Sequence, residues 1–156
     1  MRFIEHNEIW EWCADHGVAL EDHRPATDGY QPVIRLLFGE NDSERELRAV
    51  SEEVLTHLGA WDDCLLWVTD WGIWSSTEDW PTYYAARGAL GERRDLATAP
   101  GLLLTTTDQS ALLQFLEFAM QNGWDAHLLP VRGTTGSSTR AFSSHDAWIE
   151  VRARSA

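Results

Sequence analysis

The sequence predicts a single α/β domain with a mixed, partly parallel sheet of about five to seven strands and about four helices. The chain of 156 residues has the length of one domain. Short apolar runs alternate along it with amphipathic stretches that carry helix caps. Residues 102–131 have the strand–helix–strand pattern and the length of a parallel crossover. We therefore treat residues 1–156 as one globular domain in which 152–156 form a short charged tail.

The first expected helix is short and spans Asn7–His16. Asn7 can cap its start, and Gly17 can end it. Ile9, Trp12 and Cys13 share one face of this helix by their spacing. The elements expected next are a short strand over 18–22, a loop over 23–31 and a strand over 33–38.

A stronger helix signal begins at Ser43, which forms a capping box with Glu46. The apolar stripe of this helix ends at Gly59. Residues 65–71 follow as an inner strand, and strict alternation places Trp67 and Trp71 on the same face. The remaining expected elements are a helix from 76 or 77 to about 90, a strand over 102–105, a helix from Asp108 to Gly123, a strand over 124–131, a mobile loop over 132–140 and an edge strand over 147–151.

The negative charge of the chain is concentrated in its first half. The formal net charge is −13, and residues 1–80 carry 18 Asp and Glu against 5 Arg. Such a field repels nucleic acid and anionic membranes and attracts a basic protein. Acidic surfaces also serve solubility alone, and this alternative stays open. No run is long and apolar enough for a membrane span, and the first residues lack a secretion signal, so we expect a cytoplasmic protein.

The sequence lacks the residue patterns of lysine-dependent, metal-dependent and triad-type catalytic sites. All twelve basic residues are arginine, which excludes a Schiff-base lysine and a phosphate-loop lysine. Cys13 and Cys64 are expected to be buried thiols, and the histidines lack metal-ligand spacing. His145 and Asp146 supply residue types of a hydrolytic triad, but a local turn explains them better. We assign no catalytic residue, metal or cofactor.

Five of the nine tryptophans lie within twenty residues and alternate with acids. Trp67 and Trp71 are expected in the core, whereas some of the later indoles should reach the surface. Partly exposed Trp beside acids is the composition of a binding site for a basic protein surface. The residues that we assign to this surface are Asp70, Trp71, Trp74, Glu78, Asp79 and Trp80.

Two functions are compatible with this surface. The first is a small interaction protein, resembling an immunity protein or an inhibitor, that binds a basic partner. The second is a small-ligand binder or hydrolase with a cleft around Asp70, Trp71 and Trp74, to which His145 can contribute. A homodimer that uses the aromatic patch as a two-fold contact is compatible with both.

Three segments resemble a family of uncharacterised bacterial proteins. These are Trp67–Ser75 (WVTDWGIWS), Gly123–Leu129 (GWDAHLL) and Ser144–Trp148 (SHDAW). The likeness extends over residues 61–151 and weakens before them. The resemblance implies a bacterial origin, and it carries no activity and no catalytic residue.

Overall fold

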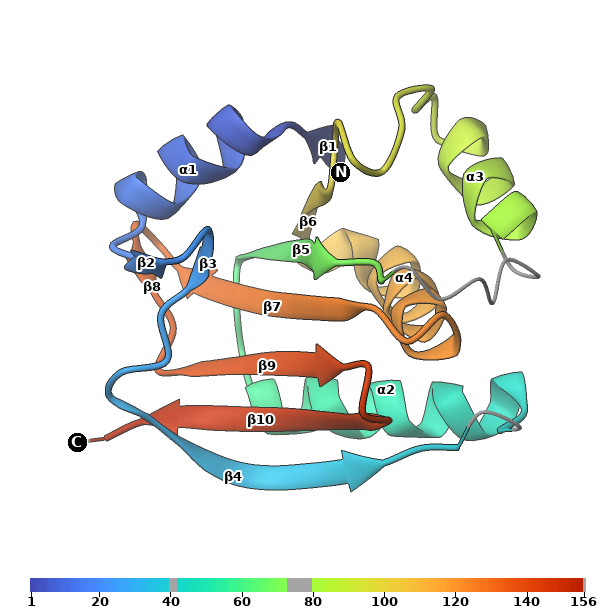
Figure 1. Cartoon of the computed structure of the whole chain (residues 1–156). Coiled ribbons are helices and arrows are strands. Elements are labelled where there is room, and N and C mark those ends of the chain that lie inside the picture. Colours follow the sequence, from blue (N-terminus) through green and yellow to red (C-terminus); the bar gives the residue numbers. More distant parts are fainter. Residues whose placement is uncertain (40–41, 73–79, 156) are drawn as a thin grey trace.

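An eight-stranded antiparallel sheet forms the centre of the computed structural model, which describes residues 1–39, 42–72 and 80–155 (Figure 1). The order of its strands is β1-β6-β5-β7-β9-β10-β4, and β8 pairs with β7. The strands are β1 (Arg2–Ile4), β4 (Tyr30–Leu37), β5 (Asp63–Asp70), β6 (Gly101–Thr105), β7 (Asp125–Arg132), β8 (Thr135–Gly136), β9 (Thr139–Ser144) and β10 (Trp148–Arg154). A separate hairpin joins β2 (Leu20–Glu21) to β3 (Arg24–Pro25). The helices are α1 (His6–Asp15), α2 (Glu44–Leu58), α3 (Trp80–Ala89) and α4 (Gln109–Gln121).

The expectation of a partly parallel sheet of five to seven strands is wrong. Every strand pairing among the described residues is antiparallel. The strand–helix–strand segment exists as β6, α4 and β7, but β5 lies between its two strands and pairs antiparallel with both. The strands β6 and β7 therefore run in the same direction without touching. The length of the segment that connects β6 to β7 predicts that the two strands run in the same direction. It does not predict that another strand is inserted between them.

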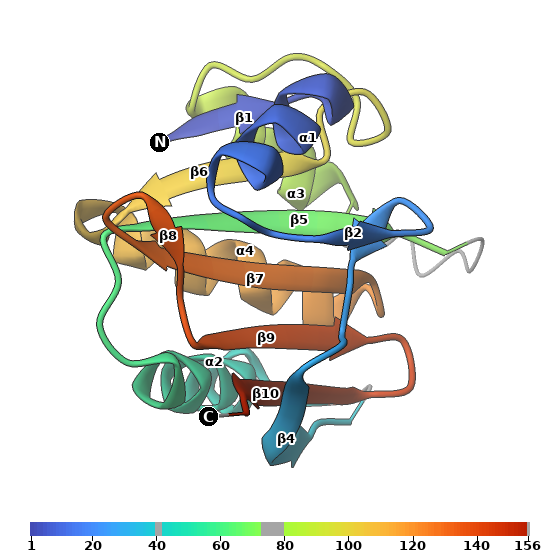
Figure 2. The ribbon, with the colours of Figure 1, turned by 90° about the vertical axis from the view of Figure 1, so that its left-hand side faces the viewer.

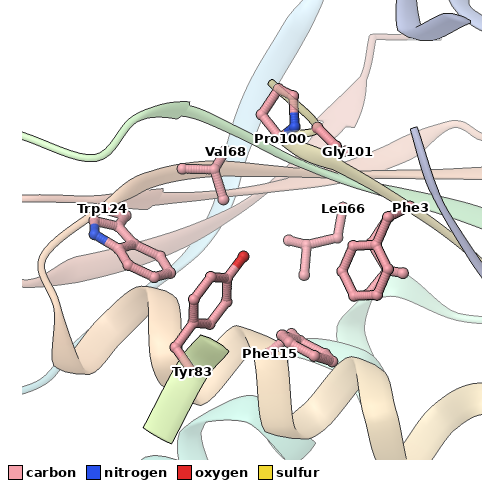
Figure 3. A pocket seen from close by; sticks show the side chains of 10 residues that line it. Phe3, Leu66, Val68, Tyr83, Pro100, Gly101, Phe115 and Trp124 are labelled. Atoms are coloured by element: carbon pink, nitrogen blue, oxygen red, sulfur yellow. The ribbon is translucent and has the colours of Figure 1, made fainter. Parts of the chain in front are cut away.

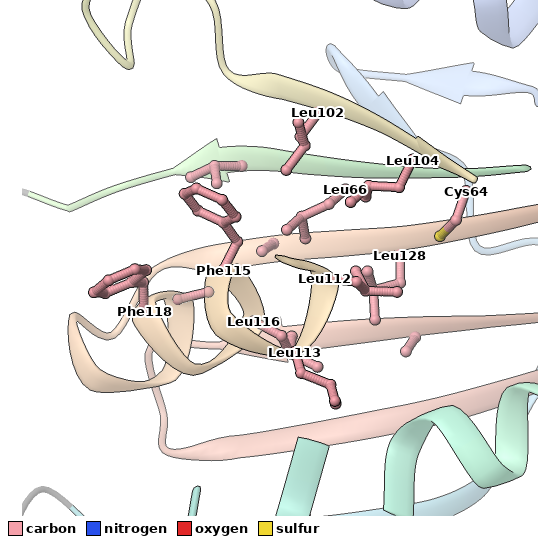
Figure 4. Close-up of a cluster of buried hydrophobic side chains, with 14 of the residues drawn as sticks. Cys64, Leu66, Leu102, Leu104, Leu112, Leu113, Phe115, Leu116, Phe118 and Leu128 are labelled. Carbon is pink, nitrogen blue, oxygen red and sulfur yellow. The ribbon is translucent and has the colours of Figure 1, made fainter. Parts of the chain in front are cut away.

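Helices cover the two faces of the sheet unequally. The helices α2, α3 and α4 lie on one face, and α1 with the β2–β3 hairpin lies on the other (Figures 1 and 2). β5 is buried on both faces: Leu66 and Val68 belong to the large core cluster, and Leu65 and Trp67 pack beneath α1. Figure 4 shows Leu112 and Phe115 of α4 directed at the strands, among the side chains of this large cluster.

The helix caps explain where the helices begin. The capping box of Ser43 and Glu46 is present at the start of α2 and confirms the prediction. At α1 the box is formed by Glu5 and Glu8, so that the helix begins one residue before the expected cap Asn7. Ile9 and Cys13 of α1 are fully buried, as their spacing predicts. Among the described helices, none has the length and apolar content that crossing a membrane requires.

Four strands were not expected from the sequence, namely β1, β3, β8 and β9. β8 lies inside the segment 132–140 that was expected to be a loop, and β9 begins in it. The alternation of β9 is hidden in the sequence by its polar and small residues. Ala141 and Ser143 face the helices, and Arg140 and Phe142 point to the opposite face. β10 continues to Arg154, into the segment expected to be a tail.

Two glycines give a matched test of this packing. A Cβ atom on Gly101 of β6 would lie 2.8 Å from Ile9 Cδ1 and 2.9 Å from Ile4 Cγ1, both fully buried side chains. A Cβ on Gly88 of α3 would meet nothing within 4 Å. We predict that Gly101→Ala lowers the free energy of unfolding by about 1–3 kcal/mol. Gly88→Ala should raise it by up to about 1 kcal/mol through helix propensity.

Urea unfolding of both variants measures these opposite signs. A Gly101→Ala variant as stable as the parent protein would contradict the close approach of α1 and β1 to β6.

Candidate functional site

A small hollow opens where three segments of the chain meet at one end of the sheet. It has a volume of about 70 Å³ and is lined by Asp70, Gly72, Gly123, Asp125 and His145. Asp70 is the last residue of β5, Asp125 is the first residue of β7, and His145 lies in the turn between β9 and β10. We call these five residues, together with the neighbouring Asp146, the acidic hollow.

Two glycines turn the chain at the walls of the hollow. Gly72 and Gly123 have φ values of 66° and 65°, in the left-handed region that favours glycine. Asp70 Oδ1 accepts a hydrogen bond of 2.7 Å from the backbone N–H of Gly72, which holds the turn after β5. Gly123 ends α4, where its N–H donates to the carbonyl of Met120. These turns bring the ends of β5 and β7 together.

The two aspartates of the adjoining strands lie directly opposite each other. Asp70 and Asp125 are Cα partners across β5 and β7, next to a register shift that begins at Val68. Like charges at opposed positions of a sheet are destabilising. Asp125 is buried, whereas Asp70 is exposed and makes no ion pair with any described residue. The negative charge of Asp70 is therefore available to a ligand.

His145 compensates the buried carboxylate of Asp125. Oδ1 of Asp125 accepts from the backbone N–H of His145 at 2.9 Å and lies 3.1 Å from its Nδ1. The other ring nitrogen, Nε2, lies 3.4 Å from Oδ1 of Asp146. The hydrogen bond to Asp125, followed by the charges of Asp125, Asp146 and Asp70, raises the pKa of His145 above its ordinary value. Three carboxylates and one imidazole leave the hollow negative in either charge state of the histidine.

Within the described residues, the ring nitrogens and hydroxyl groups at the hollow are already engaged. A general base needs a free ring nitrogen, but both nitrogens of His145 face carboxylates. The nearby hydroxyls are also engaged: Thr69 Oγ1 donates to the carbonyl of Asp125, and Ser144 Oγ accepts from the N–H of Asp146. The second contact confirms the local turn expected from the sequence. In the described part of the chain, no three His, Cys, Asp or Glu side chains are placed to hold a metal ion.

The residues assigned to the aromatic surface have different positions. Asp70 lines the acidic hollow. Trp71 and Trp80 are half-buried and pack against the large core, Trp80 with its ring 5.6 Å from that of Trp124. The other three, Trp74, Glu78 and Asp79, lie outside the described residues.

The prediction that Trp67 and Trp71 share one face is wrong. Trp67 is buried beneath α1, whereas Trp71 packs against the cluster on the opposite face. The register shift between Val68 and Asp70 breaks the strict alternation on which the prediction depended. Of the tryptophans whose exposure the structure describes, Trp10 of α1 is the most open, at 42%.

Asp125 was missed by the sequence analysis. It follows Trp124 in a buried strand, and nothing in its own segment marks it as part of a site. The sequence analysis did connect His145 with a cleft at Asp70, and both residues line the hollow.

A second, apolar cavity lies inside the core and is not a candidate site. Its walls include Leu66, Val68, Tyr83 and Phe115, and its volume is about 10 Å³. In Figure 3 the hydroxyl of Tyr83 points towards the strands. This hydroxyl accepts from Nη1 of the buried Arg87 at 2.9 Å. A space of this size holds about one water molecule, so we regard it as a packing defect.

Comparison of the chain with family models, with curated proteins and with solved structures finds no match. The resemblance to a bacterial family therefore stays a prediction.

The charge state of His145 is the first test of the acidic hollow. We predict a pKa above 6.5 for its imidazole. A raised pKa stabilises the fold below the pKa of the unfolded chain, and this contribution is lost as the pH rises through the folded value. Asp125→Asn should bring the pKa of His145 back towards 6.5, because the amide removes the main negative partner.

NMR titration of the Cε1–H signal of His145 measures both values. Asp95→Asn, which removes an exposed carboxylate elsewhere, should leave the titration unchanged. A parent protein in which His145 titrates below 6.5 would contradict the described contacts.

Proposed function

We propose that this protein is a small acidic interaction module of the bacterial cytoplasm, immunity- or inhibitor-like, which binds a basic partner. A cationic side chain of the partner, a guanidinium or an ammonium group, occupies the acidic hollow. The observation that carries the proposal is the exposed carboxylate of Asp70, which has no ion-pair partner within the described residues and lines a hollow together with Asp125 and His145.

The charge of the hollow supports a cationic ligand. His145 lies between Asp125 and Asp146 and carries at most one positive charge. Asp70 supplies the carboxylate that has no ion-pair partner within the described residues. The carboxylate of Asp70 is held by a turn hydrogen bond from the backbone N–H of Gly72. The backbone of Asp146 is held in its turn by donation from its N–H to Ser144 Oγ. A site that is ordered before binding loses less entropy when the ligand enters.

The charge of the whole chain supports a protein partner. The net charge of −13 attracts a basic surface over a distance and raises the association rate at low salt. The hollow then gives specificity at one point of contact. Half-buried Trp71, which follows Asp70 directly, contributes apolar area at the edge of the same surface.

A labelled arginine-containing peptide tests the proposal. We predict salt-sensitive binding to the parent protein and an affinity about fivefold lower for Asp70→Asn, which corresponds to about 1 kcal/mol. The asparagine keeps the oxygen that accepts from Gly72, so that the turn after β5 is preserved. Fluorescence anisotropy at low and moderate salt measures the affinity.

The matched control is Asp95→Asn, which changes the net charge equally. An equal loss of affinity in both variants would mean that only the overall charge attracts the peptide, and the proposal would fail. Absence of binding at low salt would contradict it as well. Binding of free arginine amide as tightly as of the peptide would favour a small ligand over a protein partner.

A further inference from the structure

The face of the sheet that carries α1 has a group of basic side chains, one of which, His127, lies two residues from Asp125 along β7. Arg140 of β9 and Arg152 of β10 are opposed partners on this face. His127 of β7 is opposed to Phe142, which is two residues from Arg140 on β9. Arg24 of β3 belongs to the hairpin that lies on the same face. We call Arg24, Arg140, Arg152 and His127 the arginine cluster.

The chain between β3 and β4 holds part of this cluster in place. It passes in front of β9 and β10 in Figure 2, and the carbonyl of Ala26 accepts a hydrogen bond of 2.7 Å from Nη1 of Arg140. The guanidinium of Arg140 also lies 3.7 Å from the ring centre of Tyr30. Arg140 is therefore fixed by uncharged groups, and its charge is not neutralised by them.

Carboxylates do not balance this positive charge. Glu150 of β10 is shared by Arg152 and by Arg35, whose Nη2 lies 2.8 Å from Oε2. Glu21 of β2 is the Cα partner of Arg24 across the hairpin, but the two side chains form no ion pair. Within the described residues, neither Arg24 nor Arg140 forms an ion pair. This concentration of cations is unusual in a chain of net charge −13.

Two buried nitrogen atoms of the same face lack a hydrogen-bond partner. They are Nε2 of His127 and Nε1 of Trp67, in side chains that are 6% and 1% exposed. The residues are opposed across β5 and β7, and their ring centres are 6.4 Å apart. Buried polar atoms are nearly always paired, so that unpaired ones indicate a missing partner such as an ion or a water molecule.

We propose that the arginine cluster is a binding site for an oxyanion, a phosphate-type group that accepts hydrogen bonds from Arg24, Arg140 and the imidazole of His127. Guanidinium groups bind such anions through paired N–H donors in a fixed plane. The site shares no residue with the acidic hollow and takes a ligand of opposite charge.

The titration of the cluster agrees with this assignment. Burial, followed by the charges of Arg24, Arg140 and Arg152, lowers the pKa of His127 to about 3. Burial also lowers the pKa of Arg140, with a further contribution from Arg154. The cations therefore destabilise one another, and a bound anion relieves this repulsion. An anion that binds only the folded state also raises the melting temperature.

Inorganic phosphate is the first probe, and glycerol phosphate is the second. We expect a saturable shift of the His127 ring signals in NMR spectra and a saturable rise in the melting temperature. Arg24→Gln should weaken the binding about tenfold, because it removes one charge-assisted contact. Arg24 is exposed in a hairpin, so this variant should fold normally.

Arg93→Gln is the matched control, because Arg93 is exposed and its substitution changes the net charge equally. Tighter binding of glycerol phosphate would indicate a phosphoryl group carried by a larger ligand, and tighter binding of phosphate would indicate the free ion. A His127 signal that shifts no more with phosphate than with chloride at equal ionic strength would overturn the proposal. An equal effect of both arginine substitutions would overturn it as well.

Discussion

The structure depends on the burial of β5 on both of its faces. Leu66 and Val68 need the α4 layer, and Leu65 and Trp67 need α1. A strand of this kind also needs neighbours on both edges, and β6 and β7 supply them. The helices no longer bury the strand at its last residue, Asp70, which is exposed. The acidic hollow is therefore a consequence of the core: it forms where a fully buried strand leaves the layers around it.

The distribution of charge gives the two proposed sites opposite preferences. At the end of β5, one histidine faces two carboxylates, Asp125 and Asp146, and the exposed Asp70 adds a third negative charge. On the α1 face, Glu150 is buried and engaged by two arginines, and within the described residues neither Arg24 nor Arg140 forms an ion pair. Net charge alone would have excluded an anion site in this chain. Local electrostatics depend on which side chains share a face, and strand register decides that.

The sequence predicts those parts of the fold that depend on local signals. The capping box of α2 and the apolar spacing of α1 are examples, because the interacting residues are three or four positions apart. The sheet was predicted less well. Its antiparallel order depends on the insertion of β5 between β6 and β7, and the register shift beside Asp70 separates Trp67 from Trp71. The role of Asp125 in the site could not be predicted for the same reason, because its contact with His145 joins the ends of two strands that are distant in the sequence.

The central claim is that the end of β5 and the turn after β9 form one site for a cationic group. The most direct measurement is a map of backbone amide shifts in the ¹⁵N-labelled protein as acetyl-arginine amide is added. The account predicts that the changes concentrate in the three segments that line the acidic hollow, around Asp70, Asp125 and His145. Changes spread over the acids of α2, with these three segments unaffected, would contradict it.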